Sequence, residues 1–84
     1  DFVSVLGQVN RPGPVQLTGE RKIDILEVLA LAGGLTRLAK PRIEYIHNGI
    51  TRTLNLEDLK RQKDLEKKIY VSPGDILWVD ERFL

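Results

Sequence analysis

Cysteine is absent from this sequence of 84 residues, and histidine occurs only once. A chain without cysteine forms no disulfide and offers no thiolate to a substrate or to a metal. The aspartate-rich loop of calcium sites is missing too. We therefore expect no metal site and no cofactor. The redox compartment stays open, because reducing and oxidising compartments tolerate a cysteine-free chain equally.

An excess of charge of one sign is also missing. The chain carries 13 basic and 12 acidic residues, which leaves a formal net charge of +1 at pH 7. Domains that bind nucleic acids normally show a basic excess. No apolar run approaches the roughly 18 residues that a membrane-spanning helix needs. We expect this segment neither to bind nucleic acid nor to insert into a membrane.

Motifs for catalysis are missing as well. The sequence has no G-x-S-x-G turn and no phosphate-binding glycine loop. His47 directly precedes a predicted hairpin turn, where an exposed or half-packed imidazole is the ordinary finding. The carboxylates of Glu57 and Asp58 suit the first turn of a helix, and that of Asp75 suits the closing of a turn. We therefore expect no enzymatic activity.

The chain does contain enough apolar material for one folded domain. Hydrophobic residues make up 42% of the sequence, which is too many for a disordered chain. A chain of this length supports one core and leaves no room for a second domain. It begins on Asp1 inside an apparent strand, without methionine. We interpret residues 1–84 as a single domain that is a segment of a longer protein.

The N-terminal residues predict a β-hairpin. Val3 and Val5 share one face of a strand that begins at Phe2, and Gly7 within this strand suggests a bulge or bend. A Pro-Gly turn over residues 10–13 follows, in which proline presets φ and glycine supplies a positive φ. Residues 15–17 form the return strand.

A helix is predicted over residues 25–32. Asp24 can accept a hydrogen bond at its start, and Glu27 would complete a capping box. Gly33 and Gly34 end the helix, since glycine adopts the left-handed conformation without steric cost. Glu27 is the only polar residue within the helix, so we expect the helix to be buried on nearly all sides.

Shorter elements follow in the second half of the chain. Asn48 and Gly49 form the strongest two-residue hairpin signal, and Asn55 can cap a short helix. The expected elements are strands over residues 42–47, 50–54, 69–71 and 76–79 and a short helix over residues 56–62. This order predicts an α+β fold, a mixed sheet with one helix laid across one face. The other face is then exposed unless a partner covers it.

Trp78 and the charged stretch over residues 60–68 each allow a structural and a functional interpretation. Trp78 points away from Leu77 and Val79 in the predicted last strand, so only one of these two sides is core. If Leu77 and Val79 pack beneath the helix, Trp78 lies on the uncovered face and can stack on a sugar or on a neighbouring subunit. Residues 60–68 hold five basic and two acidic side chains, which form either a solvated face or a patch for an anionic ligand.

Several short motifs follow one another in a characteristic order: a strand glycine, a Pro-Gly turn, an Ala-Gly-Gly helix end and a Pro-Gly-Asp turn. The motif residues are Gly7, Pro12, Gly13, Ala32, Gly33, Gly34, Pro73, Gly74 and Asp75. Their order and spacing, with alternating valines before them and Trp78 after them, resemble the soluble-ligand-binding β-grasp (SLBB) domain family. The resemblance is greatest to the copies in outer-membrane proteins that export capsule or exopolysaccharide.

The resemblance implies a β-grasp fold, in which a mixed sheet grips one buried central helix. It also implies a non-catalytic periplasmic module of an outer-membrane-associated protein, whose identical domains assemble into a homo-oligomeric ring along a polysaccharide conduit. The lipidation cysteine, the export domain and the C-terminal amphipathic helix of such proteins are missing from this segment. Turns, caps and packing explain the motif residues, so no ligand site carries over.

Two functions remain open at this point. In the first, the domain contributes contacts to the ring. A ring that is held by many linked contacts needs only a weak contact from each domain, so we expect the isolated segment to be largely monomeric. In the second, the domain is a weak carbohydrate or small-ligand receptor. Trp78 or Tyr45 would then stack on a sugar ring. Arg11, Arg37 or Arg42 would pair with acidic groups on the polymer.

Overall fold

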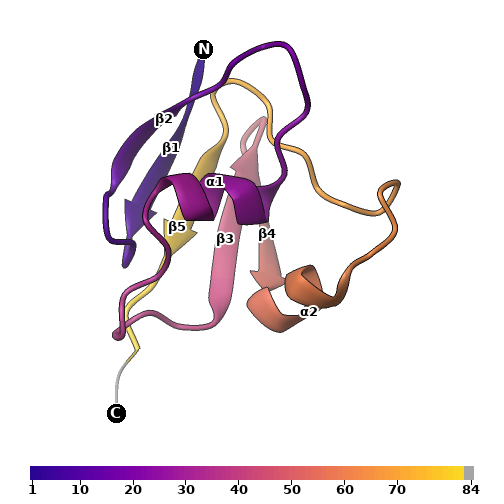
Figure 1. Ribbon diagram of the computed structural model, residues 1–84. Helices are drawn as coiled ribbons and strands as arrows, with labels where there is room; N and C mark the ends of the chain where they lie inside the picture. The colour runs from indigo at the N-terminus through magenta and orange to yellow at the C-terminus, as the bar shows by residue number, and fades with distance from the viewer. Residues whose placement is uncertain (83–84) are drawn as a thin grey trace.

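The computed structural model describes residues 1–82 and places five strands in one mixed sheet (Figure 1). The strands are β1 (Phe2–Gly7), β2 (Gly13–Gln16), β3 (Arg42–His47), β4 (Ile50–Asn55) and β5 (Ile76–Val79), and the helices are α1 (Ile25–Leu31) and α2 (Leu56–Arg61). The order across the sheet is β2-β1-β5-β3-β4. β1 and β5 run parallel, and the other neighbouring pairs are antiparallel. This confirms the predicted α+β fold, a mixed sheet of β-grasp type.

Alternation along the strands selects one face of the sheet for the core. Val3 and Val5 of β1 and Leu77 and Val79 of β5 are completely buried, as is Ile43 of β3. α1 lies across this face (Figure 1). Its buried residues, which join the same hydrophobic cluster, are Ile25, Val28 and Leu29. The core therefore has two layers, formed by every second residue of the strands and by one face of α1.

The helix is less buried than its composition predicts. Ala30 is exposed, and 49% of the Leu31 surface is accessible to solvent. The expectation of burial on nearly all sides is therefore wrong. The sheet packs against one side of α1, and this helix of seven residues turns the flank that carries Ala30 and Leu31 to solvent. The apolar sequence of α1 would allow the helix to be buried on every side, but no second layer of protein packs on its outer flank within residues 1–82.

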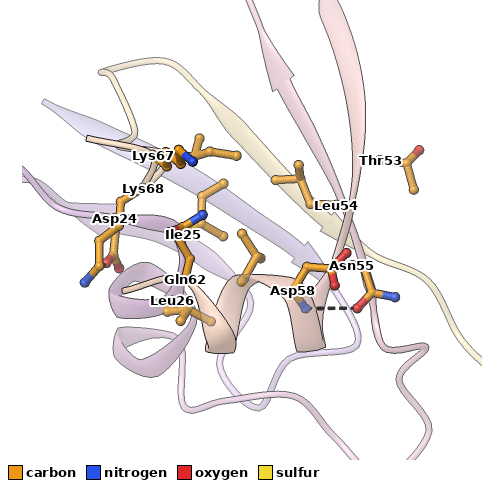
Figure 2. A pocket seen from close by; sticks show the side chains of 12 residues that line it. Asp24, Ile25, Leu26, Thr53, Leu54, Asn55, Asp58, Gln62, Lys67 and Lys68 are labelled. Carbon is orange, nitrogen blue, oxygen red and sulfur yellow. Dashed lines mark hydrogen bonds and ion pairs between the residues drawn. The ribbon is translucent and has the colours of Figure 1, made fainter. Parts of the chain in front are cut away.

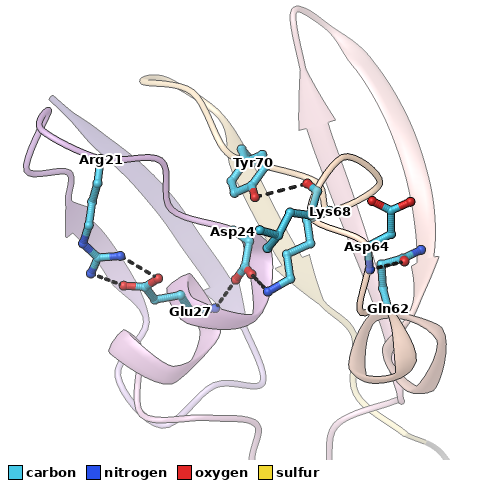
Figure 3. Close-up of polar contacts among 8 residues, drawn as sticks. Arg21, Asp24, Glu27, Gln62, Asp64, Lys68 and Tyr70 are labelled. Carbon is cyan, nitrogen blue, oxygen red and sulfur yellow. Dashed lines mark hydrogen bonds and ion pairs between the residues drawn. The ribbon is translucent and has the colours of Figure 1, made fainter.

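The start of α1 follows half of the predicted capping box. Asp24 accepts a hydrogen bond from the backbone N–H of Glu27 at 2.8 Å. The Glu27 carboxylate does not return to Asp24 but takes both of its hydrogen bonds from the guanidinium of Arg21 (Figure 3). These bonds lower the pKa of Glu27. The predicted reciprocal bond is wrong because a nearby cation offers the carboxylate a charged, bidentate partner.

The sequence predicts a strand over residues 69–71, but the structure shows only an isolated bridge between Asp24 and Tyr70. Backbone hydrogen bonds of 3.1 and 2.9 Å on either side join the same two segments. The ladder stops because α1 begins one residue after Asp24, so the partner segment turns into a helix. The other predicted elements agree with the structure to within one or two residues at their ends.

Candidate functional site

The side of the sheet turned away from α1 carries an apolar surface, which we call the open face. It consists of Phe2, Leu6, Ile46, Ile76 and Trp78. Each of these residues alternates along its strand with a buried one, so the pleat directs it away from the core. Phe2 is 52% exposed and Trp78 is 42% exposed, and the other three are half-buried. Within residues 1–82 the sheet has one face covered by α1 and one apolar face that no helix covers.

Strand register places the open-face side chains next to one another. Trp78 lies between Leu6 of β1 and Glu44 of β3. In the adjoining row, Ile76 lies beside Ile46. Side chains opposite one another in neighbouring strands are in contact distance. Apolar side chains therefore meet across the three central strands, with Ser4 and Glu44 as polar neighbours in the two rows.

The position of Trp78 confirms one of the two alternatives that the sequence leaves open. Leu77 and Val79 are both completely buried on the α1 side, so Trp78 lies on the uncovered face. Its indole N–H donates a hydrogen bond to the carboxylate of Asp80. The polar atom of the indole is thus engaged within the chain, while the ring remains available for contact with an apolar surface or a sugar ring.

The arginines proposed as partners for acidic groups do not gather around Trp78. Only Arg42 shares its face, because it lies two residues before Glu44 in β3. The guanidinium of Arg11 donates to the carbonyl oxygen of Leu31 at 3.2 Å, at the end of α1. Arg37 is exposed in a turn. The three arginines therefore form no common site with the tryptophan.

A buried polar cluster surrounds Asp75, which is 3% exposed. One carboxylate oxygen accepts the hydroxyl of Tyr45 at 2.6 Å and the backbone N–H of Ser72 at 2.8 Å. The other lies 2.6 Å from Nδ1 of His47. The bond from Ser72 confirms the predicted role of Asp75 in closing its turn. The bonds to Tyr45 and His47 are absent from the sequence prediction.

Tyr45 has a structural position in this cluster. It is 5% exposed, and its ring stacks on His47 with centroids 6.2 Å apart and planes at 21°. Burial raises the pKa of Tyr45, and the hydrogen bond to Asp75 raises this pKa further. The phenol therefore remains protonated and continues to donate. Its ring has too little accessible surface to stack on a sugar, in contrast to the sequence prediction.

A cavity of about 230 Å³ lies between the start of α1, strand β4 and helix α2 (Figure 2). Its charged residues neutralise one another in part, since Lys68 pairs with Asp24 at 3.3 Å (Figure 3). At the other end, Asn55 caps α2 by accepting the backbone N–H of Asp58 at 3.1 Å (Figure 2). Capping and ion pairing account for these polar groups. Within residues 1–82, no three residues of the metal-ligating types are grouped to hold a metal ion.

The comparison with protein families agrees with this architecture. No helix in the described part of the chain is both long and apolar enough to cross a membrane. A family model described as the SLBB domain matches residues 2–79. SLBB domains are generally non-catalytic modules. The chain belongs to the SLBB domain family.

Proposed function

We propose that this SLBB domain is a non-catalytic periplasmic module of a polysaccharide export protein. In this proposal its open face packs against a neighbouring domain of a homo-oligomeric ring that surrounds the polysaccharide conduit. The family membership and the order of the sequence motifs support the setting. The observation that carries the role in assembly is the open face itself.

The composition of the open face suits a protein neighbour. A contiguous apolar surface on a folded domain marks an interaction site. Tryptophan is enriched among the hot-spot residues that contribute most of the binding free energy of an interface. Phe2 and Trp78 are the two most exposed members of this surface, at 52% and 42%. The net charge of +1 means that identical domains repel one another only weakly. A sheet surface is also broad enough to meet another domain.

Site-specific cross-linking tests this arrangement. Since residues 1–84 contain no cysteine, Thr51→Cys introduces the only thiol of this domain, beside Ile46 at the border of the open face. Ala30→Cys introduces a matched thiol on the exposed flank of α1. Both variants are made in the export protein that carries the domain and are labelled with a short photoreactive maleimide. We expect cross-linked oligomers from Thr51→Cys and few from Ala30→Cys.

The control decides the outcome of this experiment. Equal yields from the two thiols, or a higher yield from Ala30→Cys, would contradict packing through the open face. Both substituted positions are exposed, so neither variant removes a core contact. A difference in yield therefore reports proximity and not unfolding.

A carbohydrate receptor is the second candidate, because Arg42 shares the face of the exposed Trp78. In this role the indole stacks on a sugar ring and the guanidinium pairs with an acidic substituent. NMR titration with acidic oligosaccharides tests it. Shifts of amides around Leu6, Glu44 and Trp78 at millimolar sugar would support it, and an unchanged open face would eliminate it.

A further inference from the structure

A groove of about 530 Å³ lies between the β3–β4 hairpin and residues 67–70. His47 and Arg52 line it on the side of the hairpin, and Lys67, Lys68 and Tyr70 line it on the other. His47 alternates with Ile46, so the groove is on the α1 side of the sheet. It shares no residue with the open face, and an inference about it does not rest on the proposed function.

The charged residues that line the groove are all basic. They are Arg52, Lys67 and Lys68, with His47 as a further titratable group. The whole chain has a net charge of only +1, so this arrangement is a local concentration of positive charge. Lys68 shares its charge with Asp24 at 3.3 Å (Figure 3). Arg52 and Lys67 therefore contribute most of the positive potential in the groove.

His47 is oriented by a buried carboxylate. Asp75 can only accept at this contact, so the Nδ1 atom, at 2.6 Å, carries the proton. The ring is held on its other side by stacking on Tyr45. These two contacts leave Nε2 as the nitrogen that a ligand can meet, on a side chain that is 43% exposed. A carboxylate that fixes one nitrogen of an imidazole and leaves the other for a ligand is a recurrent arrangement in binding sites.

The remaining wall of the groove is aromatic and aliphatic. The hydroxyl of Tyr70 donates to the carbonyl oxygen of Leu65 at 3.2 Å (Figure 3). The ammonium of Lys22 lies over the Tyr70 ring, 5.4 Å from its centroid. Ile50 at the hairpin end is 68% exposed. These side chains offer apolar contact to the body of a small ligand whose charged end meets the cations.

We propose that this groove binds the anionic group, a carboxylate or a phosphate, of a small ligand. Arg52 and Lys67 provide the attracting charge, and the Nε2–H of protonated His47 donates a hydrogen bond to the anion. The other charged groups nearby are Asp75 behind the imidazole, Asp24 paired with Lys68, Lys22 above Tyr70 and Glu66 next to Lys67. Because the imidazole contributes a donor only when protonated, binding tightens as the pH falls.

Titration of the ¹⁵N-labelled chain tests the proposal, with sodium D-glucuronate and inorganic phosphate as the two anions and D-glucose as the neutral control. At constant ionic strength, we expect both anions to shift amides of residues 45–52 and 67–70, with dissociation constants of about 1–10 mM. Binding of glucuronate alone assigns the groove to carboxylates, and binding of phosphate alone assigns it to phosphates. Equal shifts with glucose, or no shifts in these segments with either anion at about 50 mM, would overturn the proposal.

One substitution and its matched control separate a defined site from general charge attraction. Arg52→Gln removes a cation that lines the groove, and Lys63→Gln removes an exposed cation of the neighbouring segment that does not line it. We expect Arg52→Gln to weaken binding about fivefold and Lys63→Gln to weaken it less than about twofold. Equal weakening by the two variants would show a diffuse electrostatic effect and would overturn the site.

His47→Gln tests the proposed donor through the pH dependence of binding. The wild-type chain is expected to bind glucuronate, whose charge is the same at both pH values, about threefold or more tightly at about pH 6 than at about pH 8. Any effect of pH on the ligand itself is the same for the wild type and for His47→Gln. The variant should therefore lose the part of the gain in affinity at low pH that depends on His47. If His47→Gln retains a dispersed amide spectrum and its affinity depends on pH as strongly as that of the wild type, His47 is excluded as the donor. Cross-linking through the open face is unaffected by any of these results.

Discussion

At the scale of single residues, Gly7 shows how a motif residue can depend on a tertiary contact. Its φ is +86°, and a Cβ atom placed on it would lie 2.1 Å from the carbonyl oxygen of Val79. The same oxygen accepts the backbone N–H of Gln8 at 2.8 Å. The sequence suggests a bulge or bend at this glycine. The structure adds that the end of β5 approaches it too closely for any side chain.

Gly7→Ala should therefore destabilise the domain far more than a substitution that only strains φ. We expect its free energy of unfolding to fall by about 3 kcal/mol or more, because the contact atom belongs to the backbone of a central strand. Gly19→Ala is the matched control, since Gly19 has a φ of +77° and nothing within 4 Å of an added Cβ. It should cost about 1 kcal/mol. Urea denaturation measures both values, and equal losses would contradict the close approach.

Asp75 is a second residue whose environment decides its role. Asp75→Ala removes the acceptor of the Tyr45 hydroxyl and of the Ser72 N–H, both close to the core. We expect a loss of about 2–4 kcal/mol, against less than about 0.5 kcal/mol for the exposed control Glu20→Ala. Adding Tyr45→Phe removes the orphaned hydroxyl, so the double variant should lose less than the sum of the two single losses. Strict additivity in thermal or urea unfolding would argue against a coupled cluster.

The Asp75 cluster marks the limit of prediction from the sequence. Period two places Tyr45 and His47 on one face of a strand, and the Pro-Gly-Asp turn predicts a carboxylate that closes its own turn. The pairing of β3 with β5 brings the three side chains together across 28 to 30 positions of the sequence. Local patterns carry no information about which strands become neighbours, so these two bonds could not be derived from them.

At the scale of the elements, α1 shows that composition and burial are separate properties. The eight residues 25–32, with one polar side chain among them, predict a helix surrounded by protein. The sheet supplies contacts to Leu29, which is 3% exposed, and leaves Leu31 49% exposed. A two-layer domain covers one side of such a helix, whatever the other side is made of.

A pair of aspartate substitutions on α1 tests this one-sided packing. Leu29→Asp should abolish cooperative unfolding, because it places an unpaired carboxylate in the core. Leu31→Asp should cost about 1 kcal/mol or less, part of it from negative charge near the helix C-terminus. Thermal denaturation followed by circular dichroism compares them. A Leu29→Asp domain that melts cooperatively within a few degrees of the wild type would show that the core assignment is wrong.

At the scale of the whole molecule, the sheet divides the domain into two different surfaces. The α1 side holds the core and, at its border, the basic groove lined by Arg52 and Lys67. The open face carries Trp78 and the apolar residues around it. The proposed assembly and the proposed ligand binding therefore use opposite sides of the sheet, and we expect substitutions in one of these surfaces to leave the other unchanged.

We expect the isolated 84-residue chain to be monomeric at micromolar concentration. A stable interface between two proteins buries about 800 Å² on each partner. The open face of a single small domain adds a weak contact that becomes effective when linked copies act together. Sedimentation at about 10–100 µM measures the mass, a range in which a contact with a dissociation constant of about 1 mM or weaker stays largely dissociated. A tight, closed dimer in this range would contradict a role in which assembly depends on many linked contacts.

The sequence by itself determined the elements, except for the strand expected over residues 69–71, because turn glycines, caps and residue periods act over a few positions. It predicted the α+β class, the hairpin at Asn48 and the burial of Leu77 and Val79 opposite Trp78 as one of two alternatives. The tertiary structure alone decided which strands pair, where Gly7 meets Val79, which flank of α1 is open and which side chains meet at Asp75. These outcomes depend on contacts between residues far apart in the chain. The entropic cost of closing such long loops is offset only when the contacts of the whole sheet form.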